Sequence, residues 1–144
     1  MRKRLRDGIR ERGGFTLTEI MVVIIVVGLL ASIAAPPMFR FVASNRLQTQ
    51  SDRLAADLQY ARQLAVSSNT IMQFSSDDVG WSVVNPTTGD VLREREFKHG
   101  MTFGADIEAN FYPWGMADAK VFNVHNSAGT IVVTLLPTGM VEVN

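Results

Sequence analysis

Residues 13–36 read GGFTLTEIMVVIIVVGLLASIAAP, and this stretch is the most informative part of the chain. Between Phe15 and Ala35 the only ionisable side chain is Glu19. As an α-helix these 21 residues would be about 31 Å long, close to the thickness of the hydrocarbon core of a bilayer. The stretch therefore predicts a transmembrane helix over 15–35 that carries one acid about one turn from its start.

The first 14 residues form a basic leader. They hold six basic and two acidic side chains, a net charge of +4. Because cytoplasmic flanks of membrane helices carry an excess of Lys and Arg, we expect the N-terminus in the cytoplasm and the rest of the chain in the periplasm. Two alternatives stay open: a plain membrane anchor with Glu19 at the headgroups, and a secretory signal cut after Ala34.

Glu19 is expensive inside an apolar helix. A charged side chain at the centre of a membrane helix costs about 2.5–3.5 kcal/mol on insertion scales. We interpret Glu19 as an acid that becomes buried later, against a cation from another copy of the chain. Since stranding one partner of a buried pair costs about 3–5 kcal/mol, such a pair would fix the register of assembly.

The helix is expected to continue beyond the apolar run, to about Val66. Pro36 and Pro37 lack amide hydrogens, which predicts a kink there. From residue 36 to 69 the pattern is amphipathic, with an apolar stripe at Leu47, Leu54, Leu58, Ala61 and Leu64, together with Ala65. The other positions, Arg46, Gln50, Arg53, Asp57 and Arg62, are interpreted as a solvated, lightly paired face.

Residues 70–144 are expected to form a β-sheet head domain. After Asn69 the hydrophobic period changes to two, and Gly-, Asn- and Pro-containing turns separate the segments. Short connections favour an antiparallel sheet, completed by the apolar stripe of the helix. The fold class is therefore α+β. The expected strands are Ile71–Phe74, Trp81–Val84, Val91–Phe97, Val121–His125, Ile131–Leu136 and Met140–Val143.

The N-terminal stretch resembles the class III signal of type IV pilins and type II secretion pseudopilins. The resemblance is carried by Gly14 before Phe15, Glu19 five residues after that glycine, and a proline at the end of the run. It implies that a prepilin peptidase cuts between Gly14 and Phe15 and N-methylates Phe15. Glu19 matches the conserved glutamate of the family. The methylated amine of Phe15 stays mostly cationic near neutral pH, so the amine of a neighbouring subunit could pair with Glu19.

The second half resembles the GspH/FimT group, which comprises H-type pseudopilins of type II secretion and FimT/FimU-type minor pilins. The matching segments are DRLAADLQYARQLAVSSNT (52–70), GWSV (80–83), FYPWG (111–115) and IVVTLLPTGMVEV (131–143). The resemblance implies a pilin-like fold and a minor pseudopilin of type II secretion, with a type IV minor pilin as the alternative. The implied partners are prepilin peptidase, other pilins or pseudopilins and an inner-membrane assembly platform, with the head in the periplasm and later in an envelope filament.

Nucleic-acid binding is not expected. Many FimT-like sequences end with a glycine followed by arginines, and some such pilins are linked to DNA capture. Here the segment is GMVEV (139–143), without arginine. Removal of the leader leaves 8 basic and 12 acidic side chains, a net of −4 before the termini, whereas phosphate binding depends on positive charge.

No motif indicates an enzyme, a cofactor or a metal site. His99 and His125 lie outside any metal-binding spacing, and Asp77-Asp78 before Gly80 is typical of a turn. The loop with Phe111, Tyr112 and Trp114 is expected to supply core residues, with contact to another subunit as the alternative.

Overall fold

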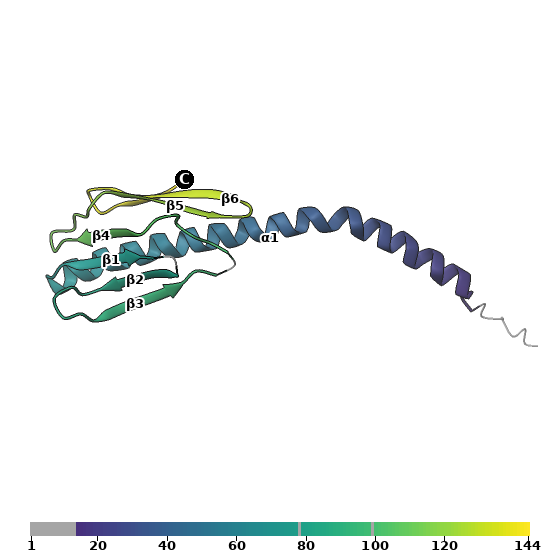
Figure 1. Cartoon of the computed structure of the whole chain (residues 1–144), viewed down its shortest axis with the longest axis horizontal. Helices are drawn as coiled ribbons and strands as arrows, with labels where there is room; N and C mark the ends of the chain where they lie inside the picture. The colour runs from purple at the N-terminus through teal and green to yellow at the C-terminus, as the bar shows by residue number, and fades with distance from the viewer. Residues whose placement is uncertain (1–13, 78, 99) are drawn as a thin grey trace, which may run out of the picture. The chain divides into compact units, whose positions relative to one another are not determined.

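The computed structural model describes residues 14–77, 79–98 and 100–144, without the side chains of residues 34–36 (Figure 1). Two compact units are present, and their boundary follows Met38. Helix α1 (Leu17–Ser68) belongs to both units. The predicted long N-terminal helix is thus confirmed, with each end two residues later than expected.

In the first unit, α1 is apolar all round. Every side chain described from Phe15 to Ile33 is exposed. Neither Leu17–Ile33 nor Pro37–Ser68 is by itself long and apolar enough to cross a membrane, and the two pass that test only as a pair, by length and composition. A helix that is hydrophobic on all sides requires apolar surroundings, from lipid or from other helices.

The C-terminus of α1 is closed by Asn69. This residue has φ of 53°, and the N–H of Thr70 donates to the carbonyl oxygen of Ala65 at 3.3 Å. This left-handed residue and six-to-one hydrogen bond are typical of a Schellman ending, in which Asn is a common substitute for Gly. The turn directs the chain back along the helix into the first strand.

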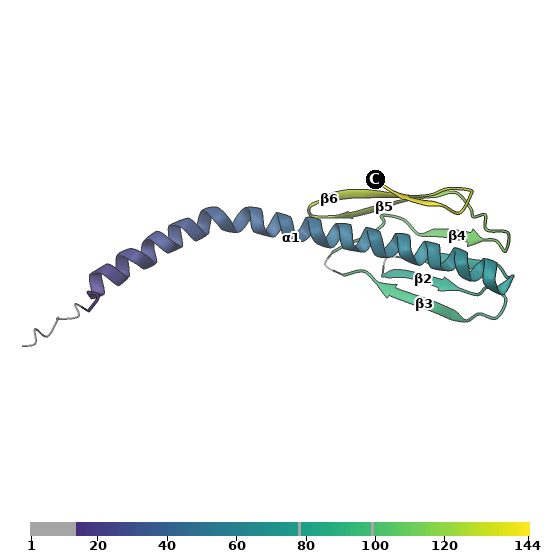
Figure 2. The ribbon, with the colours of Figure 1, turned by 180° about the vertical axis from the view of Figure 1, so that it is seen from behind.

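The second unit contains two antiparallel sheets that lie against α1 (Figures 1 and 2). The four-stranded sheet has the order β3-β2-β1-β4, and the three-stranded sheet has the order β5-β6-β7. Their strands are β1 (Met72–Ser76), β2 (Gly80–Val84), β3 (Val91–Glu96), β4 (Ile107–Phe111), β5 (Lys120–Asn126), β6 (Gly129–Leu135) and β7 (Val141–Val143).

The α+β fold class is confirmed, but the strand prediction needs two corrections. The head has two sheets instead of one, and β4 was not predicted. Residues 107–111 read IEANF, in which only Ala109 and Phe111 are buried. Such a strand has little hydrophobic signal of its own, and its pairing with β1, with Phe74 opposite Ala109, defines it.

The core of the second unit lies between the helix and both sheets. The predicted stripe is buried at Leu47, Leu54, Leu58 and Ala61, while Leu64 is half-buried. Phe74 of β1 and Phe122 of β5 meet edge to face with ring centroids 5.3 Å apart. Because these rings come from different sheets, the contact joins the two sheets over the helix.

Asp57 connects the helix to the four-stranded sheet, and its interpretation as a solvated residue was wrong. It is 1% exposed, and its carboxylate accepts hydrogen bonds from Arg93 Nη1 at 2.6 Å, Arg95 Nε at 3.2 Å and Trp81 Nε1 at 3.0 Å. The Arg93 guanidinium also lies 3.9 Å from the ring centroid of Tyr60. Gln50, assigned to the same solvated face, is buried as well.

We predict that Asp57→Ala lowers the free energy of unfolding by about 1–3 kcal/mol. The substitution strands two guanidinium groups and a buried indole N–H, although both arginines are exposed enough for water to offset part of the loss. Denaturant unfolding of the full chain in detergent, followed by Trp fluorescence, measures the effect.

Asp57→Asn keeps an acceptor for Trp81 and should fall between the wild type and Asp57→Ala. Asp52→Ala is the control, because Asp52 is an exposed helical acid that bonds only to Gln48 among the described residues. Equal unfolding midpoints for Asp57→Ala and Asp52→Ala would contradict a stabilising role for Asp57.

Candidate functional site

The first turn of α1 is set by Thr16. Its Oγ1 accepts a hydrogen bond from the N–H of Glu19 at 3.2 Å, and its carbonyl oxygen accepts one from the N–H of Ile20 at 3.2 Å. These are the two bonds of a helix N-cap residue. Thr16 therefore starts the helix one residue after the predicted cleavage position.

Thr16 is a helix-capping residue that the sequence analysis missed. The spacing Thr16-x-x-Glu19 before an apolar run is the signature of a capping box, and it could have identified both residues together. Glu19 occupies the first turn, where the helix dipole favours a negative charge. Its side chain is exposed and forms no salt bridge among the described residues, so the carboxylate is open to a partner.

The bond between Gly14 and Phe15 lies outside the helix. Both residues are exposed and without regular secondary structure, and Phe15 is 77% exposed. Apart from its two chain neighbours, no described residue lies within 4 Å of the position that a Cβ on Gly14 would take. The described residues therefore do not cover the Gly14–Phe15 peptide bond, and residues 1–13 of the predicted leader lie outside the described part of the chain.

The predicted kink at Pro36 and Pro37 stays a prediction. The helix continues through both positions, and Pro37 is exposed. The side chain of Pro36 lies outside the described residues.

The three aromatic residues of the 111–115 segment have different surroundings. Phe111 is fully buried as the last residue of β4, so it is a core residue and contributes nothing to the surface. Tyr112 and Trp114 stack, with ring centroids 5.0 Å apart and an interplanar angle of 10°. Trp114 is 69% exposed, which leaves one of its faces open to solvent.

Hydrogen bonds from several segments hold this aromatic turn in place. Arg62 of α1 donates from Nε to the carbonyl oxygen of Gly115 at 2.8 Å, and the N–H of Ala117 donates to Pro137 at 3.0 Å. Gly139 has φ of 75°, and a Cβ there would overlap Arg62 and the Gly115 carbonyl, so a glycine is required. Trp114 is thus displayed on a turn fixed by the helix and the C-terminal loop.

Asp118 anchors the same turn through Tyr112. Burial raises the pKa of Asp118, but hydrogen bonds from the backbone and side-chain amides of Asn110 and from the Tyr112 hydroxyl, with the charge of Lys120, hold that pKa below its usual value. The hydrogen bond to Asp118 in turn raises the pKa of Tyr112. At neutral pH the pair is a carboxylate accepting from a neutral phenol.

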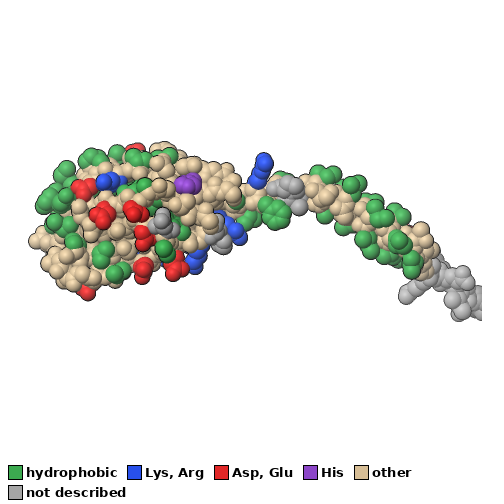
Figure 3. Space-filling model, viewed as in Figure 1, with side chains coloured by type: hydrophobic (Ala, Val, Ile, Leu, Met, Phe, Trp, Pro, Cys, Tyr) green, Lys and Arg blue, Asp and Glu red, His purple; other side chains and the backbone are tan. Residues whose placement is uncertain are grey.

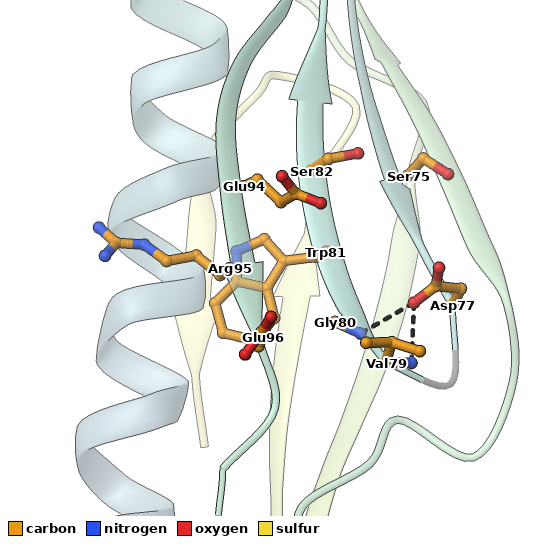
Figure 4. A pocket seen from close by; sticks show the side chains of 9 residues that line it. All are labelled: Ser75, Asp77, Val79, Gly80, Trp81, Ser82, Glu94, Arg95 and Glu96. Atoms are coloured by element: carbon orange, nitrogen blue, oxygen red, sulfur yellow. Dashed lines mark hydrogen bonds between the residues drawn. The ribbon is translucent and has the colours of Figure 1, made fainter.

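A small hollow of about 110 Å³ on the four-stranded sheet gives no sign of catalysis (Figure 4). Asp77 accepts hydrogen bonds from the N–H groups of Gly80 and Val79, both at 2.8 Å, and these bonds lower its pKa. This carboxylate therefore makes the turn that the sequence indicated. Figure 4 shows the side chain of Arg95, which also lines this hollow, extending from β3 toward α1.

No metal centre is formed by the described residues. They include no group of three His, Cys, Asp or Glu side chains that could hold an ion. His125 is half-buried, with its Nδ1 3.3 Å from the carbonyl oxygen of Asn123. His99 and Asp78 lie outside the described residues.

Two family models match the chain. The model for type II transport protein GspH covers residues 50–142, and the model for the prokaryotic N-terminal methylation motif covers residues 9–35. No protein of curated function matches. The second match includes Gly14 and Phe15, which precede α1, and Glu19 in its first turn.

Two solved structures share the fold. Both are crystal structures of the type IV minor pilin FimU from Pseudomonas aeruginosa strain PAO1. One aligns with a TM-score of 0.57 and 20% identity over 72% of this chain and 92% of FimU. The other aligns with a TM-score of 0.54 and 19% identity over 67% of this chain and 91% of FimU. The likeness confirms the pilin-like α+β architecture.

The GspH match spans well over half of the sequence, and the methylation motif covers the start of the helix that the fold places before the head. The resemblance found in the sequence is therefore confirmed: this chain belongs to the GspH family of type IV pilin-like proteins.

Proposed function

We propose that this protein is a minor pseudopilin of a type II secretion system, assembled through its N-terminal helix into an envelope filament that helps to secrete proteins. The observation that carries this proposal is the exposed, apolar start of α1, preceded by the exposed residues Gly14 and Phe15, with a Glu19 that forms no salt bridge among the described residues. The match to a type II transport family supports the choice of system.

The second candidate is a minor pilin of a type IV pilus. It is favoured by the fold shared with the minor pilin FimU. At 19–20% identity this likeness concerns architecture alone, so it ranks below the family match. DNA capture is the weakest variant of this candidate, because residues 139–143 hold one acid and no arginine.

In this proposal the exposed apolar side chains of α1 have to stay covered throughout assembly. The chain first resides in the inner membrane with its head in the periplasm, and prepilin peptidase then removes residues 1–14. Each of these Ile, Leu or Phe side chains would cost about 1.5–3 kcal/mol if it were left in water. Lipid covers these side chains before assembly, and other pilins or pseudopilins cover them afterwards, with an inner-membrane platform guiding the exchange.

Glu19 supplies specificity in this exchange. Cleavage creates a cationic amine on Phe15, which N-methylation leaves charged. In a bundle of such helices the amine of one subunit can pair with Glu19 of the next, and an unmatched register would bury both charges alone. The role is structural, and we propose no catalytic activity.

The stacked Tyr112 and Trp114 are the proposed contact to another subunit. Exposed aromatic residues on a fixed turn are suited to protein interfaces, because little conformational entropy is lost when they bind. The acidic sheet surfaces then remain outside the helical bundle.

The intact mass of the chain from its native membranes tests processing. We expect a chain that begins at Phe15 and carries one added methyl group. A chain beginning at Ala35 would show a secretory signal, and an uncut Met1 form would show a plain anchor. Either result would contradict the filament proposal.

Deletion in the native host distinguishes the two candidate systems. We expect the loss of secreted proteins from the medium, with surface pili unchanged. Loss of pili with normal secretion would assign the protein to a type IV pilus instead.

We predict that Glu19→Ala reduces incorporation into the filament at least tenfold, because the amine of the neighbouring subunit is left without its counter-charge. Cleavage at Gly14 should continue. The measurement is the ratio of filament-bound to membrane-bound protein, and Thr18→Ala, in the same exposed turn, is the control. Wild-type incorporation of the Glu19 variant would contradict the ion pair.

We predict that Trp114→Ala weakens cross-linking to neighbouring subunits. The free energy of unfolding should change by no more than about 0.5 kcal/mol, because the ring is largely exposed. The control is Met140→Ala, which removes a similarly exposed apolar side chain outside the aromatic stack. Equal cross-linking yields for the two variants would contradict the proposed contact.

A further inference from the structure

One face of α1 in the second unit carries cations without acids. Val42, Arg46, Thr49 and Arg53 recur every three or four residues, so they share a side of the helix. With Asn45 and Lys98 they line a groove of about 300 Å³. We call this feature the basic groove.

The described part of the chain does not neutralise the positive charge of the basic groove. Among the described residues, Arg46, Arg53 and Lys98 form no salt bridge, whereas Arg93 and Arg95 both bind Asp57. No Asp or Glu lines the groove, and the sequence has no acid from Ile20 to Ser51. In the view of Figure 3, blue side chains gather where the helix enters the head, and red ones lie over the sheets.

The cationic character is strongest at the Arg46 end. A neighbouring hollow of about 320 Å³ shares Arg53 and Lys98 but also includes Glu94 and Glu96. These acids reduce the positive potential around Arg53 and Lys98. Arg46 lines the basic groove, which contains no acid, and does not line the neighbouring hollow, so it is the best single probe of the groove.

Apolar side chains extend the same helix face toward the N-terminus. Phe39 is 74% exposed and precedes Val42, which is 38% exposed, by three residues. An apolar segment followed by cations on one helical face is typical of helices that lie at a membrane surface. Arginine can keep its stem on apolar surface while its head stays among polar groups.

The dimensions indicate how such a face could reach lipid. Within the second unit, Arg46 lies about 11 Å and Arg53 about 21 Å beyond Phe39 along the axis of α1. The headgroup layer on each side of a bilayer is only roughly 5–8 Å thick. The basic groove therefore contacts phosphates only when this face lies along the membrane surface.

We propose that the basic groove binds the headgroup phosphates of anionic phospholipid, so that the head lies on the membrane before assembly. The inference rests on the proposed function, because residues 15–35 must hold the chain in the membrane. The charge of the groove is complementary to an anionic leaflet, and Phe39 and Val42 match its apolar boundary. A DNA backbone would make no use of these apolar residues, and three cations release few counterions.

Energy transfer in vesicles tests the proposal with the full chain. The sequence contains no cysteine, so Ser44→Cys, exposed but not lining the groove, gives a single site for a donor dye. The acceptor is a headgroup-labelled lipid. We expect greater transfer in vesicles of 70% phosphatidylcholine and 30% phosphatidylglycerol than in phosphatidylcholine alone, and a loss of this difference at 0.5 M salt.

Arg46→Glu should reduce the fraction of heads near the lipid about fivefold for each unit of charge changed. Lys120→Glu is the matched control, because it makes the same charge change at an exposed residue of β5 outside the groove. Equal effects of the two variants would show that lipid binding depends only on the net charge of the head, and would overturn the assignment to the groove.

Flotation of the same samples separates this inference from the proposed function. Protein that floats with both vesicle types, without a phosphatidylglycerol effect, overturns the groove inference and leaves membrane residence intact. Protein that floats with neither vesicle type overturns both the groove inference and the proposed function.

Two results would assign the groove to another occupant. Tighter binding of a 20-base-pair DNA duplex than of the anionic vesicles, abolished by Arg46→Glu, would assign the groove to nucleic acid. A transfer signal that disappears on diluting the protein within the vesicles would assign it to a second copy of the chain.

Discussion

The helix α1 has to suit two environments, and this constraint accounts for the main features of the molecule. From Phe15 to Ile33 it exposes apolar side chains on all sides, which only lipid or similar helices can cover. From Leu47 onward its apolar residues form one stripe, which the strands of the same chain bury. The first part therefore depends on other molecules, whereas the second part completes its core alone.

The acids Asp57 and Glu19 of α1 differ in their partners. Asp57 has its hydrogen bonds satisfied inside the chain by Arg93, Arg95 and Trp81, so it links the helix to β2 and β3. Glu19 has its backbone N–H capped by Thr16, while its carboxylate has no cation among the described residues. The carboxylate of Asp57 therefore contributes to the stability of the head. The carboxylate of Glu19 would instead affect association, because its burial in a helical bundle favours only arrangements that supply a positive charge.

Sequence patterns predicted the elements that depend on local periodicity. They missed the residues and the strand whose partners lie far away in the sequence. The helix, the buried stripe and six of the seven strands follow from spacings of three to four residues and of two. Asp57 resembled a solvated helical acid because its arginine partners lie 36 and 38 residues further along the chain. Strand β4 carries only two buried side chains, and its pairing with β1 defines it. Thr16 was predictable, since the capping-box spacing was present in the quoted stretch.

Acidic and basic side chains lie on different parts of the head, so the head would turn its basic face toward an anionic surface. Removal of the leader leaves an acidic chain, yet Arg46, Arg53 and Lys98 remain together on one face of the helix. A contact between this face and anionic lipid would be held by exposed charges, which salt screens over about 8 Å at physiological ionic strength. Contacts of that kind are weak and reversible, unlike the burial of the apolar helix in a bundle. Such a head can rest on the membrane while the helix is embedded there, and it can leave once neighbouring helices replace the lipid.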